Sequence, residues 1–189
     1  GIMRTFIAIP IPDITKDHLE HAQQAAAELC RKGRYVPKEN YHVTLHFLGE
    51  ISPQEVEDVV QAMMETARSN RPFPLHLEGL GFFPRGKEGV LWAGVETNVA
   101  LQRLFRHLQT NLGKQGFPRE KRGLRPHITL GREVEPYRNF ADVQKKVQLE
   151  REEISVNEII LMESVRKGAK LMYQSLFVQP LKDKSFSKK

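Results

Sequence analysis

Two segments of the chain share one pattern: they read His42-Val43-Thr44-Leu45 and His127-Ile128-Thr129-Leu130. With seven histidines and seven threonines in 189 residues, chance placement gives about 0.3 His-x-Thr triplets, so two are unusual. The β-branched residue between His and Thr favours a strand. Because side chains alternate along a strand, each histidine and its threonine share one face and the apolar residues occupy the other. The pattern predicts two strands, each with a polar and an apolar face.

The surroundings of the two motifs also match. The strand-like run Phe6-Ile7-Ala8-Ile9 begins 36 residues before the first histidine, and Trp92 of Leu91-Trp92-Ala93-Gly94-Val95 lies 35 residues before the second. Each run is followed by a predicted helix and a basic loop. This order indicates an internal duplication and predicts two pseudo-symmetric lobes with a groove between them. The alternative is that two strand–helix–strand units of one α+β domain resemble each other by default.

Periodicity, helix caps and turn residues predict an α+β chain. Residues 3–180 are expected to form one bilobal domain and residues 181–189 a basic, disordered tail. The expected strands are Thr5–Ile9, Tyr41–Leu48, Leu75–Phe83, Val90–Glu96, Pro126–Arg132, Ser155–Val165 and Leu171–Val178; the expected helices run from Asp13 to about Lys32, Ser52 to Arg68, Asn98 to Lys114 and Phe140 to Val147.

Composition limits the classes of protein that fit. Hydrophobic residues at 40% and charged residues at 28% are typical of a soluble globular protein, and no apolar run reaches the roughly 18 residues of a membrane span. The single cysteine, Cys30, excludes an intramolecular disulfide and a cysteine-built zinc site, and it suits the cytoplasm. The net charge of +6 favours polyanionic partners, of which nucleic acid is the commonest.

Basic residues gather before each motif. Lys32, Arg34 and Lys38 precede the first, and a second group lies in the loop Gly116–Arg125 before the other. Such groups add a positive field for an anion, although solvated loop charges are an equally ordinary explanation. The second group consists of Arg119, Lys121, Arg122 and Arg125.

The motif side chains suit proton transfer at phosphorus. Histidine changes charge near neutral pH, so His42 and His127 can divide the work of acid and base. The hydroxyls of Thr44 and Thr129 can donate to phosphoryl oxygens. A cyclic phosphodiester is a suitable substrate for these four side chains, because its strained ring lowers the demand for a metal ion. The alternative for each histidine is a satisfied polar residue on a half-buried strand. If the catalytic interpretation holds, the imidazoles should face each other about 5–8 Å apart.

The paired motifs, with Phe47-Leu48-Gly49 after the first and Arg125-Pro126 before the second, resemble the two-histidine phosphoesterase superfamily. Within it the chain is most similar to the RNA 2',3'-cyclic phosphodiesterases, also called 2'-5' RNA ligases. The resemblance implies two lobes, each an antiparallel sheet with helices outside, and a basic groove between them. It implies hydrolysis of an RNA terminal 2',3'-cyclic phosphate to a 2'-phosphomonoester, with His42 as proton donor and His127 as proton acceptor. It implies no metal or cofactor, RNA partners such as tRNA fragments, and a monomer.

Three further residues are candidates for substrate binding. Arg125 lies two residues before His127 and is expected to share its face. Arg132 follows the second motif, but simple alternation places it on the opposite face, so it needs a strand end or a bulge to reach a phosphate. His46 is expected to share a face with His42 and to line the groove. These two histidines would lie about 13 Å apart on a strand, too far to share a metal.

Two other functions remain open from the sequence. A 2'-5' RNA ligase or a phosphodiesterase for small cyclic nucleotides could use the same site. A duplicated RNA- or nucleotide-binding module without turnover is the alternative from another class. The intact histidines and threonines of both motifs argue against the module, because binding alone does not require two titratable groups.

Overall fold

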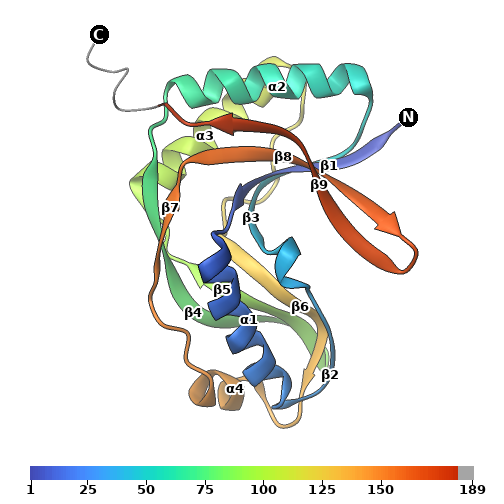
Figure 1. Ribbon diagram of the computed structural model, residues 1–189, viewed down its shortest axis with the longest axis vertical. Coiled ribbons are helices and arrows are strands. Elements are labelled where there is room, and N and C mark those ends of the chain that lie inside the picture. The colour runs from blue at the N-terminus through green and yellow to red at the C-terminus, as the bar shows by residue number, and fades with distance from the viewer. Residues whose placement is uncertain (183–189) are drawn as a thin grey trace.

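The computed structural model describes residues 1–182, which form two antiparallel sheets with helices on their outer sides (Figure 1). The α+β class and the bilobal arrangement predicted above are confirmed. The strands are β1 (Met3–Pro10), β2 (Cys30–Tyr35), β3 (His42–Ile51), β4 (Phe73–Arg85), β5 (Glu88–Val95), β6 (His127–Pro136), β7 (Glu153–Val156), β8 (Glu158–Lys167) and β9 (Lys170–Pro180); the helices are α1 (Asp13–Ala27), α2 (Pro53–Arg68), α3 (Val99–Lys114) and α4 (Phe140–Lys146), with a 3-10 turn η1 (Lys38–Asn40).

The two sheets are built in the same order around the two motif strands. The upper sheet in Figure 1 has the order β3-β1-β8-β9, and the lower sheet has the order β2-β6-β5-β4-β7. In each sheet the motif strand pairs with the strand that begins its own repeat, β3 with β1 and β6 with β5. This matched order supports the predicted duplication. The lower sheet has one additional strand, β2, which pairs with the outer edge of β6.

Helices α1 and α3 do not pack on the sheet that contains the strand before them in the chain. Helix α1 follows β1 of the upper sheet but packs against β2 and β6 of the lower one, and α3 follows β5 of the lower sheet but packs beside α2 above the upper one (Figure 1). The lobes therefore do not correspond to successive halves of the chain. Each lobe is completed by a helix from the other half.

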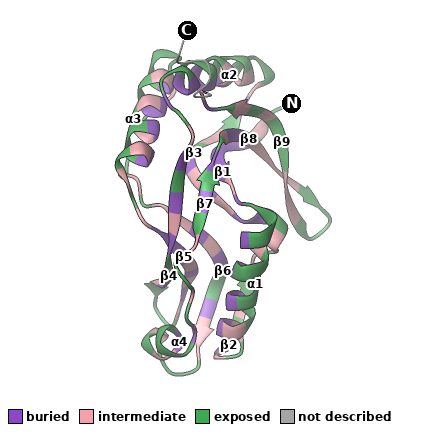
Figure 2. Ribbon diagram, turned by 60° about the vertical axis from the view of Figure 1, so that its left-hand side comes forward, coloured by how far each residue is buried: buried purple, intermediate pink, exposed green. Residues whose placement is uncertain are grey.

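Buried side chains fill the space between each sheet and its helices (Figure 2). Helix α2 begins with the predicted capping box, in which Ser52 and Glu55 bind each other's main-chain N–H groups. Leu181 is buried, and the Lys182 N–H donates to Asn70 O at 2.9 Å, so these two residues of the predicted tail belong to the body of the fold. Residues 183–189, the rest of that tail, lie outside the described residues.

The first predicted helix is wrong at its C-terminal end. It ends at Ala27, not at Lys32, and the next residues form β2. The strand Cys30–Tyr35 has the sequence Cys-Arg-Lys-Gly-Arg-Tyr, so it carries no apolar periodicity of its own. Its partners on β6 and the ion pair between Arg31 and Glu135 (2.9 Å) hold it extended. Cys30 is buried in this sheet, not on a helix face.

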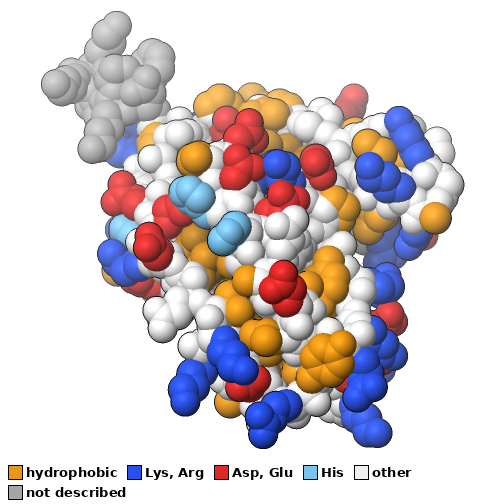
Figure 3. Space-filling view, turned by 60° about the horizontal axis from the view of Figure 1, so that its bottom comes forward, with side chains coloured by type: hydrophobic (Ala, Val, Ile, Leu, Met, Phe, Trp, Pro, Cys, Tyr) orange, Lys and Arg blue, Asp and Glu red, His pale blue; other side chains and the backbone are white. Residues whose placement is uncertain are grey.

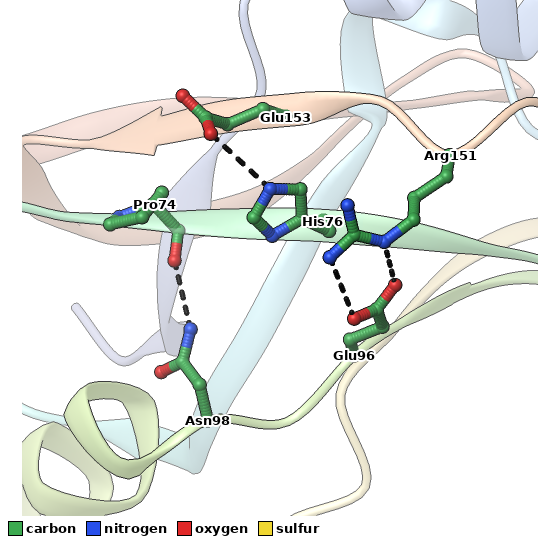
Figure 4. Close-up of polar contacts among 6 residues, drawn as sticks. All are labelled: Pro74, His76, Glu96, Asn98, Arg151 and Glu153. Atoms are coloured by element: carbon green, nitrogen blue, oxygen red, sulfur yellow. Dashed lines mark hydrogen bonds and ion pairs between the residues drawn. The ribbon is translucent and has the colours of Figure 1, made fainter.

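The sequence predicts a single strand over Ser155–Val165, but its first part belongs to β7, a separate strand that pairs with β4. Polar contacts hold this edge together (Figure 4). Arg151 binds both carboxylate oxygens of Glu96, at 2.5 and 3.2 Å, and His76 Nε2 lies 3.2 Å from the Glu153 carboxylate.

None of the helices in residues 1–182 combines the length and the apolar character of a membrane span.

Candidate active site

The two motif histidines occupy equivalent positions in the two sheets. Each is the first residue of its strand: His42 lies opposite Pro10 on β1, and His127 lies opposite Gly94 on β5. Thr44 and Thr129, two residues further on, are also paired with the first strand of their repeats. Strands β3 and β6 contact each other across the two lobes. The fold therefore brings the beginnings of the two motifs together from different sheets.

A main-chain carbonyl fixes each imidazole in the same way. His42 Nδ1 lies 2.7 Å from Asn40 O, and His127 Nδ1 lies 2.7 Å from Arg125 O, in each case two residues earlier. A carbonyl oxygen can only accept, so both Nδ1 atoms carry the hydrogen. In the neutral ring Nε2 is then the free acceptor. The Thr44 hydroxyl, 2.8 Å from His42 Nε2, donates to it.

Aromatic side chains enclose His42. Its ring stacks on Phe6 with 4.7 Å between the ring centroids, and the edge of Tyr173 approaches it at 5.2 Å. Burial is the main reason that the pKa of His42 falls from 6.5 to about 4. Electrostatic interactions with His127, Arg132 and Lys16 lower this pKa further, whereas the hydrogen bond to Asn40 raises it. The ring is therefore neutral at pH 7 when no ligand is bound.

The second imidazole has its own aromatic neighbours. The edge of Phe83 lies 5.5 Å from the His127 ring, and Trp92 lies 6.2 Å away, between centroids. Both residues come from the β4–β5 hairpin, whereas the neighbours of His42 come from β1 and β9. The two half-buried rings thus occupy similar aromatic settings made by different elements.

Arg132 lies close enough to His42 to lower its pKa, and its charge also acts on Tyr173. An irregularity of β6 accounts for this position. The pairing of β6 with β5 shifts at Leu130, which has no partner on β5, so the alternation of side chains changes phase between His127 and Arg132. Simple alternation is therefore interrupted, and the bulge that Arg132 would need is present.

The expectation that His46 lines the groove is wrong. Thr44 pairs with Ala8 and His46 with Ile7, so Leu45 is an extra residue in β3 and alternation changes phase there. His46 is only 2% exposed, whereas the next residue, Phe47, is 64% exposed. The Gln109 amide donates to His46 Nδ1 at 2.7 Å, and burial lowers the pKa of this histidine.

The basic loop before the second motif is attached to the strand of the first. The Phe47 N–H donates to the Glu120 carboxylate at 2.7 Å, and the Glu120 N–H donates to the Gln109 side chain at 2.9 Å. Glu120 thus occupies the outer edge of β3, the position that β2 has beside β6. This attachment places Arg119 and Lys121, the exposed cations on either side of Glu120, beside β3.

A surface cavity of about 590 Å³ lies away from the histidines, between the β4–β5 turn and the C-terminal end of β6, and is lined by Phe82, Tyr137 and Phe140 among others. It is lined by no histidine, so it is separate from the two motif histidines. Among residues 1–182, no group of three or more His, Cys, Asp or Glu side chains is arranged to hold a metal ion.

Comparison with known proteins identifies the family of this site. The model of the 2'-5' RNA ligase superfamily matches residues 12–168, which include both motifs. The chain belongs to this superfamily. A relative from Thermotoga maritima, an RNA 2',3'-cyclic phosphodiesterase, is 34% identical over 134 residues, covering 69% of this chain and 70% of its own. A relative of the same description from Archaeoglobus fulgidus is 29% identical over 178 residues, covering 93% and 99%.

Two solved structures share the fold. The protein TT0787 of Thermus thermophilus superposes with a TM-score of 0.79 at 26% identity, covering 96% of this chain and all of that one. LigT of E. coli, complexed with 3'-AMP, gives the same TM-score at 24% identity, covering 96% and 99%. The resemblance based on the two motifs is confirmed at the level of the family.

Four residues near the histidines are absent from the site predicted by sequence. Tyr173 and Phe6 contact His42, Asn40 supplies the carbonyl for its Nδ1, and Lys16 contributes charge from α1. Of these four residues, only Asn40 could have been recognised from the sequence. It lies two residues before His42, just as Arg125 lies two residues before His127. Tyr173 and Lys16 are brought to the site by tertiary contacts.

Proposed function

We propose that this protein hydrolyses the 2',3'-cyclic phosphate at the end of an RNA chain and leaves a 2'-phosphomonoester, without a metal ion. The superfamily assignment and the names of the relatives support the substrate class. The observation that carries the mechanism is the matched pair of imidazoles, each with Nδ1–H bound to a carbonyl two residues earlier and with Nε2 left for proton transfer.

In this mechanism the cyclic phosphate lies between the two Nε2 atoms. Water attacks phosphorus in line as His127 Nε2 takes its proton; the bond from phosphorus to the 3' oxygen breaks, and His42 Nε2–H protonates that oxygen. Thr44, Thr129 and Arg132 stabilise the charge that develops on the phosphoryl oxygens. Arg125, at the start of the second motif strand, contacts the RNA chain.

His42 must gain a proton before it can act as the donor. Its pKa of about 4 means that the ring is neutral at pH 7. A phosphodiester anion beside the ring favours the protonated form and raises this pKa. Substrate binding therefore prepares the acid, and the Thr44 hydroxyl, which donates to His42 Nε2 in the empty site, becomes free to bind a phosphoryl oxygen.

The decisive experiment offers the protein a short RNA with a terminal 2',3'-cyclic phosphate in the presence of EDTA and identifies the product by mass spectrometry and ³¹P NMR. A 2'-phosphate end is expected. His42→Ala or His127→Ala should each lower kcat by at least about 100-fold, and the double variant should be little worse than the weaker single one. Thr44→Val or Thr129→Val should cost about 10- to 100-fold.

His21→Ala, a change at an exposed position of α1, is the matched control and should leave kcat unchanged. If the protein binds the RNA without turnover, it is a binding module and not an enzyme. Longer RNA products in the presence of a 5'-hydroxyl RNA would indicate ligation at the same site. Activity that survives both histidine changes, or that EDTA abolishes, would refute the proposed mechanism.

A further inference from the structure

The end of the β8–β9 hairpin projects from the upper sheet as a two-stranded arm (Figure 1). Strand β1 pairs with β8 only from Ile160 to Glu163, so residues 164–173 pair with one another alone. The turn at the tip contains Gly168, whose φ of 65° suits glycine. A projecting arm of this kind contributes little to the core, and its residues are therefore available for a role at the surface.

The arm carries three cations at its tip and no carboxylate. Arg166, Lys167 and Lys170 are all exposed, and none forms an ion pair with any residue from 1 to 182. Lys167 and Lys170 lie directly opposite each other, an arrangement of like charges that destabilises a hairpin. A polyanion bound at the tip would remove this repulsion. Lys and Arg side chains are visible on the right-hand side of Figure 3, where the arm lies.

The base of the same arm contacts the catalytic histidine. Tyr173 packs its edge on the His42 ring, and Arg166, two positions from Ser164, the partner of Tyr173, lies on the same face of the hairpin. At about 3.4 Å per residue, Lys170 stands about 10 Å along the strand from Tyr173. The tip is thus within a few nucleotides of a phosphate held at His42.

Asn40 fixes the arm relative to the site. Its side-chain amide donates to Leu171 O at 2.9 Å, while its own carbonyl accepts from His42 Nδ1 at 2.7 Å. Asn40 is 8% exposed, so one buried residue connects the arm to the catalytic ring. The main chain of the arm is therefore anchored at Leu171, beside the ring of His42.

We infer that the arm of residues 164–173 binds the phosphodiester backbone of the RNA just upstream of its cyclic end, and so makes the enzyme prefer oligonucleotides to mononucleotides. This inference rests on the proposed function. The cations supply charge contacts that are independent of sequence. Arg166 faces the same side as Tyr173 and is suited to the phosphate nearest the cyclic end. Lys167 and Lys170 alternate to the other face of the hairpin, beside the turn, and are suited to phosphates further upstream, where the RNA passes the tip.

The test compares two substrates of the full-length protein: an RNA of about six nucleotides ending in a cyclic phosphate, and a 2',3'-cyclic mononucleotide. The triple variant Arg166→Ala, Lys167→Ala, Lys170→Ala should lose about 10-fold or more in kcat/KM on the oligonucleotide and change less than about twofold on the mononucleotide. The salt dependence of oligonucleotide binding should also become shallower, by about one unit of slope for each phosphate that the variant no longer binds.

A matched control removes three cations from the other end of the upper lobe, with Arg71, Arg103 and Arg106 changed to alanine; these residues are exposed. This control should keep the preference for the oligonucleotide. Since the opposed lysines repel, the arm variant should unfold at the same temperature as the wild type or higher. Equal losses on both substrates, no loss on the oligonucleotide, or an equal loss in the control would overturn the inference. A wild type that hydrolyses neither substrate would instead refute the proposed function.

Discussion

The hydrogen bonds from Nδ1 to a carbonyl two residues earlier give His42 and His127 the same tautomer. Their environments nevertheless differ. Phe6 stacks on the first ring and Tyr173 covers it, so its pKa falls to about 4. At this scale the protonation of His42 depends on how far its neighbours exclude water, because burial disfavours the charged imidazolium.

Tyr173 offers a direct test of this dependence. Tyr173→Ala opens the His42 ring to water, so the penalty on the charged form becomes smaller and the pKa should rise from about 4 toward its ordinary value of about 6.5. A ¹⁵N NMR titration of the His42 side chain would measure the change. The pH dependence of kcat/KM reports pKa values of the free enzyme. Its limb near pH 4 should therefore move to higher pH as the pKa of His42 rises.

Tyr173→Phe is the matched control, because it keeps the ring and removes only the hydroxyl. The pKa of His42 should stay low in this variant. If the two variants shift the pKa equally, the hydroxyl and not the aromatic ring is responsible, and burial by the ring does not explain the lowered pKa.

At the scale of secondary-structure elements, a buried glutamine on each crossing helix supports the motif strand of the other repeat. The Gln23 amide on α1 donates to Leu130 O on β6 and to Val36 O, at 2.8 and 2.7 Å. The Gln109 amide on α3 binds His46 on β3. Gln23 lies 17 residues after Phe6, and Gln109 lies 17 residues after Trp92. The two glutamines therefore hold equivalent positions in the two repeats.

Gln23→Leu should lower the free energy of unfolding by about 1–3 kcal/mol, the usual cost of leaving buried polar groups without a partner. Urea denaturation would measure the loss. Gln24→Leu is the matched control, since the neighbouring side chain is exposed on the same helix, and it should change stability by less than about 0.5 kcal/mol. Equal effects of the two substitutions would show that the hydrogen bonds of Gln23 do not stabilise β6.

Most helices and strands could be predicted from the periodicity of the sequence, but two features of the structure could not. The strand Cys30–Tyr35 has no apolar alternation, and it becomes a strand only because the edge of β6 is available to pair with it. The burial of His46 depends on a bulge at Leu45, and a one-residue insertion in a strand leaves no trace in residue types. The motif positions were predictable because both halves repeat them, whereas Tyr173 reaches the site from β9, remote in sequence.

For the molecule as a whole, histidines with lowered pKa values make the folded state sensitive to acid. Burial lowers the pKa of both His42 and His46. As pH falls below about 6.5, these groups become protonated in the unfolded chain but stay neutral in the folded one, so the free energy of unfolding should decrease. For His42 this loss continues until about pH 4, and it amounts to at most about 3 kcal/mol at one pKa unit per 1.36 kcal/mol.

Urea denaturation between pH 7.5 and 4 would measure this loss in the wild type and in His42→Ala. The variant should show a shallower dependence on pH, because it lacks one of the groups responsible. His21→Ala, at an exposed site, should retain the slope of the wild type. An identical slope in His42→Ala would contradict the lowered pKa.

The exchange of helices between the two sheets has a consequence for how such a chain could arise. A polypeptide with only one repeat would leave α1 without β6, or α3 without α2, the element of the other repeat on which each helix packs. Two identical copies would satisfy both helices by swapping them, which gives a homodimer with a histidine on each side of its twofold axis. Symmetry would make those two histidines chemically identical. Fusion of the copies into one chain removes that constraint, so Tyr173 can cover one ring while Phe83 and Trp92 border the other, and acid and base can diverge.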